Sequence, residues 1–354
     1  MSRFLTQKLS KLTPYTPGEQ PKGTSYVKLN TNESPFPPSE KAIAYAAEAA
    51  KKLQLYPDPN VTELSEKLAE ALSVDKEQLI LTNGSDEVLY FAFMAYCDNE
   101  RKAIFPDITY GFYSVYAEIN GVPYEEKPLG EDFTVNIDDY LEKGSTVFIA
   151  NPNAPTGLIL SVSDIERILK ADPDRVVVID EAYVDFGGES CIPLINKYPN
   201  LLVTGTFSKS RSMAGARLGF GVGSKELIND LVTIKYSTNP YNINRMTAAA
   251  GIGQLEDKEY TEANCKRIIE NREYTARELR ALGFEMTDSK ANFLFAKHSA
   301  IGGKELYEKL KSRGILVRHF DKERLFDYNR ISIGSREQME IFISAVKAIL
   351  EEKK

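Results

Sequence analysis

Short apolar runs alternate with helix-like segments between about residues 62 and 250. Segment 62–72 has the apolar spacing of a helix, and the apolar run 79–81 follows it. Further apolar runs of strand length lie at 146–150, 176–179, 201–204 and 218–222. Helix-like segments such as 161–170 and 224–235 separate several of these runs. Because strands that alternate with helices form βαβ units, the pattern predicts an α/β fold with a mostly parallel central sheet flanked by helices.

The pattern changes after about residue 256. A long polar helix is expected over 256–281, then a strand near 291–297 and a helix near 303–313. The last helix carries one apolar face, formed by Met339, Phe342, Val346 and Ile349. These elements predict a smaller α+β lobe.

The first 40 residues are rich in proline, which interrupts helices and strands. The prolines are Pro14, Pro17, Pro21, Pro35, Pro37 and Pro38. We expect an N-terminal arm that lies over another surface, although a frayed terminus is the simpler alternative. The predicted organisation is an arm of the small lobe at 1–40, a large domain at 41–255 and a small C-terminal domain at 256–354.

Composition narrows the class of protein. The 354 residues include 42% hydrophobic and 27% charged residues, which is ordinary for a folded enzyme and excludes disorder. The net charge of −7 gives no basic excess for binding nucleic acid. Three widely spaced cysteines, Cys97, Cys191 and Cys265, fit neither a disulfide framework nor a metal site and indicate a reducing compartment. No apolar stretch is long enough for a membrane span, so we expect a cytoplasmic enzyme. Because the cysteines do not fit a metal site, we also expect no metal.

Polar clusters directly follow the predicted strands. Functional groups of parallel sheets gather at the carboxyl ends of strands. Asp180 follows the run 176–179, and on its own it is either a solvated loop residue or a buried partner for a cation. The rigid turn Asn151–Gly157 follows the run 146–150, and it is either a plain loop or a holder for a hydrogen-bond donor.

Lys209 stands among small hydroxyl residues after the run 201–204, in the sequence Thr206-Phe207-Ser208-Lys209-Ser210, with Arg217 eight positions further on. An exposed lysine is the ordinary interpretation. Together, however, an amine, hydroxyls and a guanidinium suit a phosphorylated aldehyde, because the amine forms a Schiff base and the other groups bind the phosphate.

A phosphate also needs backbone donors. Gly84-Ser85-Asp86 follows the run 79–81 and opens a helix, where free N–H groups and the positive dipole end point outward. Glycine permits close approach and Ser85 is expected to cap the helix. An ordinary helix cap remains the alternative for this segment alone.

Three of these segments together resemble the aminotransferase family of fold type I pyridoxal-phosphate enzymes. They are NPNAPTG (151–157), DEAY (180–183) and TFSKSRSMAGARLG (206–219), in the order and spacing of that family. The resemblance covers about residues 25–350. It implies the fold type I architecture and the cofactor pyridoxal 5'-phosphate.

The resemblance also implies roles for individual residues. Lys209 would bind the cofactor covalently and then move a proton during turnover. Asp180 would pair with the pyridine nitrogen, Tyr183 would hydrogen-bond the ring oxygen, and Tyr110 would stack on the ring. The residues implied around the phosphate are Gly84, Ser85, Asp86, Thr206, Ser208, Arg217 and, from a second subunit, Tyr56.

One position departs from the family pattern. The family usually has asparagine directly before PTG, where it donates to the ring oxygen, and this chain has Ala154 there. Either the neighbouring Asn153 replaces that donor through a shifted turn, or Tyr183 binds the oxygen alone.

The ends of the chain resemble histidinol-phosphate aminotransferases more narrowly. The resemblance rests on LTPY (12–15), LNTNESP (29–35), YPD (56–58), PYN (240–242), GILVR (314–318) and NRISIG (329–334). It implies that Arg330 and Arg318, with Tyr15 and Asn32, bind the substrates. The implied reaction converts L-histidinol phosphate and 2-oxoglutarate into imidazole-acetol phosphate and glutamate by a ping-pong mechanism.

Other functions remain open at this level. Threonine-phosphate decarboxylase and aromatic amino-acid aminotransferase would use similar residues, and a non-catalytic binding module of the same fold is a more remote alternative. The resemblance further implies a homodimer with shared active sites. Small phosphorylated amines and 2-oxoglutarate or glutamate are the expected partners, rather than nucleic acid or membrane.

Overall fold

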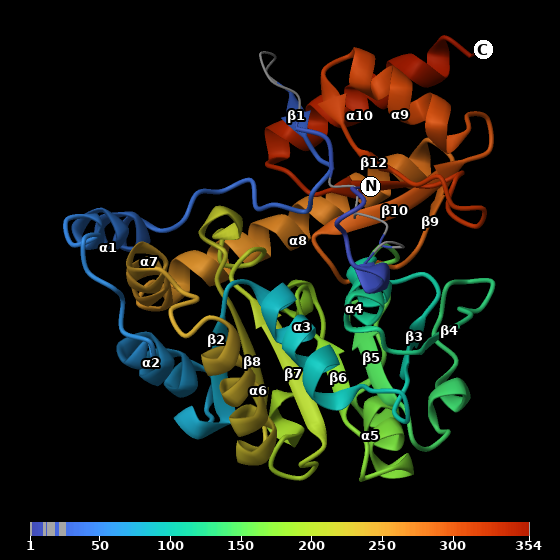
Figure 1. Ribbon diagram of the computed structural model, residues 1–354. Coiled ribbons are helices and arrows are strands. Elements are labelled where there is room, and N and C mark those ends of the chain that lie inside the picture. Colours follow the sequence, from blue (N-terminus) through green and yellow to red (C-terminus); the bar gives the residue numbers. More distant parts are fainter. Residues whose placement is uncertain (1, 10–11, 13–17, 21–25, 354) are drawn as a thin grey trace.

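The computed structural model of the protein describes residues 2–9, 12, 18–20 and 26–353. Two bodies are visible in Figure 1. A seven-stranded sheet with its helices forms the larger body, here named the large domain. The smaller body, the small domain, contains a four-stranded sheet and most of the chain after residue 280, and the long helix α8 (Lys258–Ala281) runs between the two.

The large-domain sheet is parallel except for one strand. Its strand order is β2-β8-β7-β6-β5-β3-β4, and only β8 runs antiparallel to its neighbours. The bounds are β2 (Leu79–Thr82), β3 (Ala103–Pro106), β4 (Tyr124–Lys127), β5 (Thr146–Ala150), β6 (Val177–Asp180), β7 (Leu201–Thr206) and β8 (Gly219–Gly223). The expected mostly parallel α/β sheet is therefore confirmed.

Helices cover both faces of this sheet, which explains why its inner strands β5, β6, β7 and β8 are buried along their whole length. In β5, Val147 and Ile149 pack into one hydrophobic core while Phe148 packs into a second core on the opposite face. The helices are α1 (Glu40–Ala50), α2 (Thr62–Leu72), α3 (Ser85–Tyr96), α4 (Phe112–Asn120), α5 (Val162–Ala171), α6 (Lys225–Thr238) and α7 (Arg245–Leu255).

The small domain has its own core and its own sheet. The antiparallel order is β12-β13-β10-β9, and the apolar face of the last helix packs into this core as expected. The N-terminal strand β1 pairs in parallel with β11, so the segment before α1 contributes to this body. The bounds are β1 (Val27–Lys28), β9 (Phe284–Met286), β10 (Phe293–His298), β11 (Ile315–Leu316), β12 (Arg318–His319), β13 (Asn329–Ser332), α9 (Gly303–Ser312) and α10 (Arg336–Glu351).

The hydropathy pattern predicts many of these elements but not the strands β1, β3, β4, β9 and β12 or the helices α4 and α7. Strand β3 has the sequence Ala-Ile-Phe-Pro, in which proline is unusual for an inner strand, and the edge strand β4 has the sequence Tyr-Glu-Glu-Lys, which carries no apolar run. The cap of α3 also differs from the expectation. Gly84 is the N-cap, and Ser85 is the first residue of the helix.

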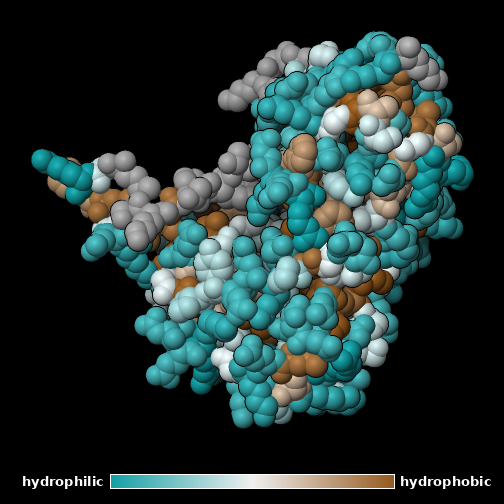
Figure 2. Space-filling view, turned by 90° about the vertical axis from the view of Figure 1, so that its right-hand side faces the viewer, coloured by the Kyte–Doolittle hydropathy of each residue, from teal (hydrophilic) through white to brown (hydrophobic). Residues whose placement is uncertain are grey.

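The surface shown in Figure 2 is largely hydrophilic, with apolar side chains in small groups. Within the described residues, no helix is both long and apolar enough to cross a membrane. The same part of the chain contains no group of three or more His, Cys, Asp or Glu side chains arranged to bind a metal. All three cysteines are buried and free.

Candidate active site

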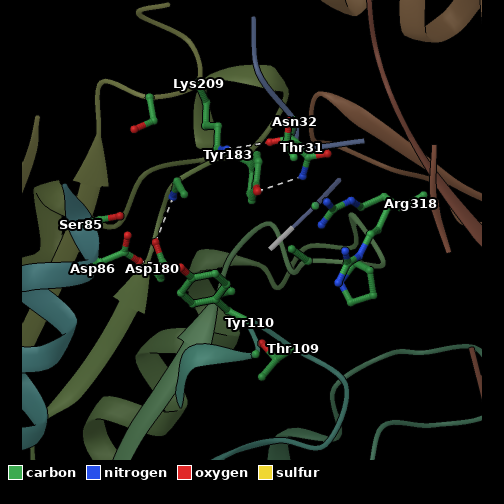
Figure 3. Close-up of a pocket in the computed structure, with 18 of the residues that line it drawn as sticks. Thr31, Asn32, Ser85, Asp86, Thr109, Tyr110, Asp180, Tyr183, Lys209 and Arg318 are labelled. Atoms are coloured by element: carbon green, nitrogen blue, oxygen red, sulfur yellow. Dashed lines mark hydrogen bonds between the residues drawn. The ribbon is translucent and has the colours of Figure 1, made fainter. Parts of the chain in front are cut away.

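A cavity of about 870 Å³ lies where the two domains meet. The carboxyl ends of β6 and β7 and the start of α3 line one side, and the small-domain residues Arg318 and Arg330 line another. Figure 3 shows that Lys209 lies around the same space as Asp180 and Tyr183, which precede it by more than 25 positions in the sequence. Because β6 and β7 run parallel, their carboxyl ends lie at the same edge of the sheet.

Asp180 ends β6 and is buried, with 5% of its surface exposed. Its carboxylate accepts hydrogen bonds from Thr204 Oγ1 (3.1 Å), the backbone N–H of Ala182 (3.2 Å) and Tyr113 Oη (3.4 Å). Burial nevertheless raises the pKa of Asp180 to about 6, because the low-dielectric surroundings disfavour the charged form. A cation facing Asp180 in the cavity would offset that cost.

Lys209 follows β7 and lines the cavity, half-buried. Its ammonium nitrogen lies 3.3 Å from the carbonyl oxygen of Thr31 and 5.7 Å from the centre of the Tyr183 ring. The next two residues are anchored, since Ser210 donates to the carboxylate of Asp185 and the Arg211 guanidinium lies 3.4 Å from it. The amine therefore projects into the cavity from a fixed backbone segment (Figure 3).

Tyr183 lies beside Lys209 and contacts the small domain. Its ring packs edge-on against Phe293, with centroids 5.2 Å apart. Its hydroxyl oxygen accepts a hydrogen bond of 3.0 Å from Nδ2 of the buried Asn32. Asn32 thus contacts Tyr183 directly, a contact that the sequence does not reveal.

A chain of polar groups crosses the start of α3. Tyr110 donates to Asp86 Oδ1 (2.5 Å), and Arg217 contacts Asp86 Oδ2 (2.8 Å). Gly84 has φ 79° at this point, and a Cβ there would lie 2.6 Å from Arg217 Nη2. The missing side chain thus leaves room for the guanidinium beside the helix N-terminus.

Thr206 and Ser208 complete this side of the cavity, and their hydroxyl oxygens lie 2.9 Å apart. Ser85, Thr206, Ser208 and Arg217 therefore surround one end of the cavity together with the first N–H groups of α3. Hydroxyls, a guanidinium and a helix N-terminus are the donors that bind a phosphate.

The turn after β5 brings Ala154, rather than Asn153, to the cavity. The Asn153 amide donates to Ile108 O (2.9 Å) and Thr156 Oγ1 (3.0 Å), and its oxygen accepts from Thr109 (2.7 Å). Asn153 is 4% exposed and does not line the cavity. Its contacts give no support to the expected role in cofactor binding and instead stabilise the turn.

Arg318 and Arg330 lie side by side because they are register partners on the antiparallel strands β12 and β13. Arg330 Nη2 donates to the carbonyl oxygen of Asn30 (3.1 Å), and both guanidinium groups lie over the ring of Phe320. Two cations at one end of the cavity are suited to binding a carboxylate or a phosphate.

Tyr56, like Asn153, is a predicted site residue that does not line this cavity. Tyr56 is 79% exposed and stacks on Tyr241, with centroids 4.7 Å apart. Tyr15 lies outside the described residues. Conversely, Thr204 and Tyr113, which donate to Asp180, carry no signal in the sequence, because a single hydroxyl or aromatic residue in a strand or helix has no distinctive pattern.

The residues present fit pyridoxal 5'-phosphate. The buried carboxylate of Asp180 suits a protonated ring nitrogen, and Lys209 suits the aldehyde. The donors around Ser85 suit the phosphate, with Gly84 leaving the space that a Cβ would fill.

Comparison with known proteins assigns the chain to a class. The family model for aminotransferase class I and II matches residues 24–346. A solved histidinol-phosphate aminotransferase from Clostridium acetobutylicum superposes with a TM-score of 0.84 at 25% identity, covering 92% of this chain and 99% of that one. The enzyme from Sinorhizobium meliloti, solved with pyridoxal-5'-phosphate, superposes with a TM-score of 0.91 at 21% identity, covering 100% and 99% of the two chains, and shows the shared fold.

The chain therefore belongs to the class I and II aminotransferases, enzymes that depend on pyridoxal 5'-phosphate. Two curated relatives narrow the assignment. The histidinol-phosphate aminotransferase of Brachyspira hyodysenteriae is 47% identical over 353 residues, covering 99% of this chain and 100% of that protein. That of Acinetobacter baumannii is 46% identical over 349 residues, covering 98% and 97%. Within the family, the chain thus groups with the histidinol-phosphate aminotransferases.

Proposed function

We propose that the enzyme transfers the amino group between L-histidinol phosphate and 2-oxoglutarate, giving imidazole-acetol phosphate and glutamate. The observation that carries this proposal is the pair Arg318 and Arg330, which faces the same cavity as Lys209. A guanidinium pair accepts either a carboxylate or a phosphate, so one binding region serves both substrates. Because they use the cavity in turn, we expect ping-pong kinetics.

Each catalytic residue has a role that follows from its position. Bound pyridoxal 5'-phosphate supplies an electron sink for the electron pair left at the substrate Cα. Asp180 keeps a proton on the ring nitrogen, since a buried carboxylate is strongly favoured by a neighbouring cation. Lys209 moves the proton at the substrate Cα as general acid and base, and Tyr183 donates to the ring oxygen.

The phosphate of the cofactor would lie at the start of α3. Ser85, Thr206 and Ser208 would supply hydroxyl donors, and Arg217 would supply charge. Asp86 fixes the position of Arg217 through the 2.8 Å ion pair and also accepts from Tyr110. Tyr110 would thereby be oriented with its ring against the cofactor.

The test is an assay of the purified protein with glutamate and imidazole-acetol phosphate. We expect histidinol phosphate to form, and Lys209→Ala protein prepared in parallel to form none. Failure to form it, with release of carbon dioxide from threonine phosphate, would replace the proposal by a decarboxylase. An equal rate with phenylpyruvate would instead indicate an aromatic aminotransferase.

We further propose a homodimer in which Tyr56 reaches the phosphate of the partner subunit. Tyr56 is exposed, as are Leu53 and Leu55 beside it, and Arg245 donates to its carbonyl oxygen (2.7 Å), which fixes the loop. Mixing Lys209→Ala and Tyr56→Ala proteins tests this arrangement. A mixed dimer would contain one intact site, so we expect mixing to recover activity. If subunit exchange is shown to occur and activity is still not recovered, the shared site is contradicted.

The three buried free thiols accord with a cytoplasmic location.

A further inference from the structure

The segment of Thr31 and Asn32 contacts both Lys209 and Tyr183. The carbonyl oxygen of Thr31 lies 3.3 Å from Lys209 Nζ, and Asn32 Nδ2 lies 3.0 Å from Tyr183 Oη (Figure 3). Asn32 is 1% exposed and has φ 55°, in the left-handed region. A buried amide in this conformation is retained only where its surroundings determine both its backbone and its side chain.

Small-domain residues determine the orientation of Asn32. The Ser332 hydroxyl oxygen accepts a hydrogen bond from the backbone N–H of Asn32 (2.8 Å), and the hydroxyl donates one to Asn32 Oδ1 (2.9 Å). Asn292 Nδ2 donates to the Asn32 carbonyl oxygen (3.0 Å). Because Oδ1 is bound to Ser332, the N–H₂ end of the amide is directed at Tyr183.

This orientation decides which way the Tyr183 hydroxyl points. Its oxygen accepts from Asn32, so its own hydrogen is available to another acceptor. Tyr183 lines the cavity, and a hydroxyl that accepts one hydrogen bond becomes a stronger donor in the next. The family position that would otherwise supply a second donor is occupied by Ala154, whose methyl group packs in one cluster with Tyr183 and Phe293.

We propose that Asn32 is a positioning residue that directs the Tyr183 hydroxyl at the cofactor's ring oxygen and thereby compensates for the donor missing at Ala154. This inference rests on the proposed function, because it requires the ring oxygen to lie beside Tyr183. Ser332 and Asn292 link this hydrogen bond to the small domain. The ring environment therefore depends on the relative placement of the two domains.

A spectroscopic titration of the holoenzyme tests the inference. The Schiff base between Lys209 and the cofactor changes its absorbance when it loses a proton, and a donor to the negative ring oxygen favours the deprotonated form. Weakening this donor therefore raises the pH midpoint. We expect Tyr183→Phe to raise it by about 1 pH unit and Asn32→Gly by roughly half as much, since a hydrogen bond to a charged group contributes about 1 to 2 units.

Three features of the design make the variants interpretable. Glycine tolerates the positive φ of residue 32, so Asn32→Gly removes the amide without backbone strain. Asn32→Asp keeps the shape but replaces the donor by an acceptor, so it should raise the midpoint more than Asn32→Gly. Asn30→Ala is the matched control, because the buried Asn30 amide binds Glu19 O (2.9 Å) instead of Tyr183.

The combined variant separates a relay through Tyr183 from a general effect on the fold. If Asn32 acts through Tyr183, Asn32→Gly gives no further shift in the Tyr183→Phe protein. The inference would be overturned if Asn32→Gly shifted the pH midpoint equally in the wild-type and Tyr183→Phe proteins. It would also be overturned if Asn32→Gly caused no shift in the wild-type protein. The charged groups that line the cavity are unchanged in all these variants; they are Glu33, Asp86, Asp107, Glu118, Glu126, Asp180, Lys209, Arg217, Arg318, Lys322 and Arg330. A wild-type protein without any borohydride-sensitive band would instead refute the proposed function.

Discussion

Replacing Asp180 by asparagine should stabilise the cofactor-free protein while it disables the enzyme. The folded pKa of about 6 lies above the value of 3.8 for a free aspartate, because burial disfavours the carboxylate. The folded protein therefore binds a proton more tightly than the unfolded chain. Stability from this group is fully present below about pH 3.8 and is lost as the pH rises through about 6.

The expected magnitude follows from this difference in pKa. A shift of about 2 units corresponds to about 3 kcal/mol of lost stability at pH 8, and about half of that at pH 5. The amide introduced by Asp180→Asn would keep an oxygen for Thr204 and the Ala182 N–H, and Tyr113 could turn to accept from its N–H₂ group. Asp180→Asn should therefore recover most of the stability that the charged Asp180 carboxylate costs the cofactor-free protein at pH 8.

The assay is urea unfolding of protein stripped of cofactor, at pH 5 and pH 8. Circular dichroism is the suitable signal because the chain contains no tryptophan. Asp172→Asn is the contrasting control, since backbone donors, first that of Gly144, lower the pKa of Asp172 and asparagine should lower stability there. An Asp180→Asn protein no more stable than wild type at pH 8 would refute the reasoning.

Adding pyridoxal 5'-phosphate should reverse the order of stability. In the proposed holoenzyme Asp180 would face a protonated ring nitrogen, so its buried charge would be paired and the loss of that charge would be costly. We expect Asp180→Asn to lose at least about 100-fold in turnover, as for a charge-assisted hydrogen bond of about 3 kcal/mol. The same substitution thus separates the requirements of folding from those of catalysis.

Three further substitutions address other parts of the site. Lys209→Ala should leave the circular dichroism spectrum intact and abolish turnover, and retained transamination would contradict its role. Gly84→Ala should weaken cofactor binding by about 10-fold in an equilibrium titration, because φ 79° is strained for alanine by about 1 kcal/mol or more and the new Cβ displaces Arg217 from Asp86. Arg330→Lys should raise KM for both substrates by about 10-fold, since lysine keeps the charge but loses the planar fork; an unchanged KM in steady-state kinetics would exclude a binding role.

The parallel core of the fold was accessible from sequence because its strands are buried on both faces. Strands β5, β6 and β7 are continuous apolar runs for that reason, and each is followed by a polar cluster. The edge strand β4 has neighbours on one side only and carries charged residues, so hydropathy could not reveal it. Burial thus explains why β4 was missed, whereas β3, whose four residues are all buried, shows that burial alone does not make a strand predictable.

The site residues divide in the same way. Asp180 and Lys209 drew attention because they follow or end apolar strands, and the family resemblance then implied their roles. The contact between Asn32 and Tyr183 joins residues 151 positions apart, and Asn32 is oriented by Ser332, which lies 300 positions from it along the chain. Such contacts depend on how the small domain packs against the large one, which no local pattern encodes.

Asn153 and Ala154 show where a motif alone is insufficient. The sequence allowed a shifted turn that would bring Asn153 to the cofactor, but its amide is bound to Thr109, Ile108 and Thr156. Turning Asn153 inward would break its hydrogen bonds to these three residues, two of which lie on the loop after β3. Each buried polar group left without a partner costs about 1–3 kcal/mol of stability. Because that cost exceeds what a single new hydrogen bond returns, the turn keeps Ala154 at the cavity. Under the proposed function, Tyr183 would then bind the ring oxygen without help from this turn.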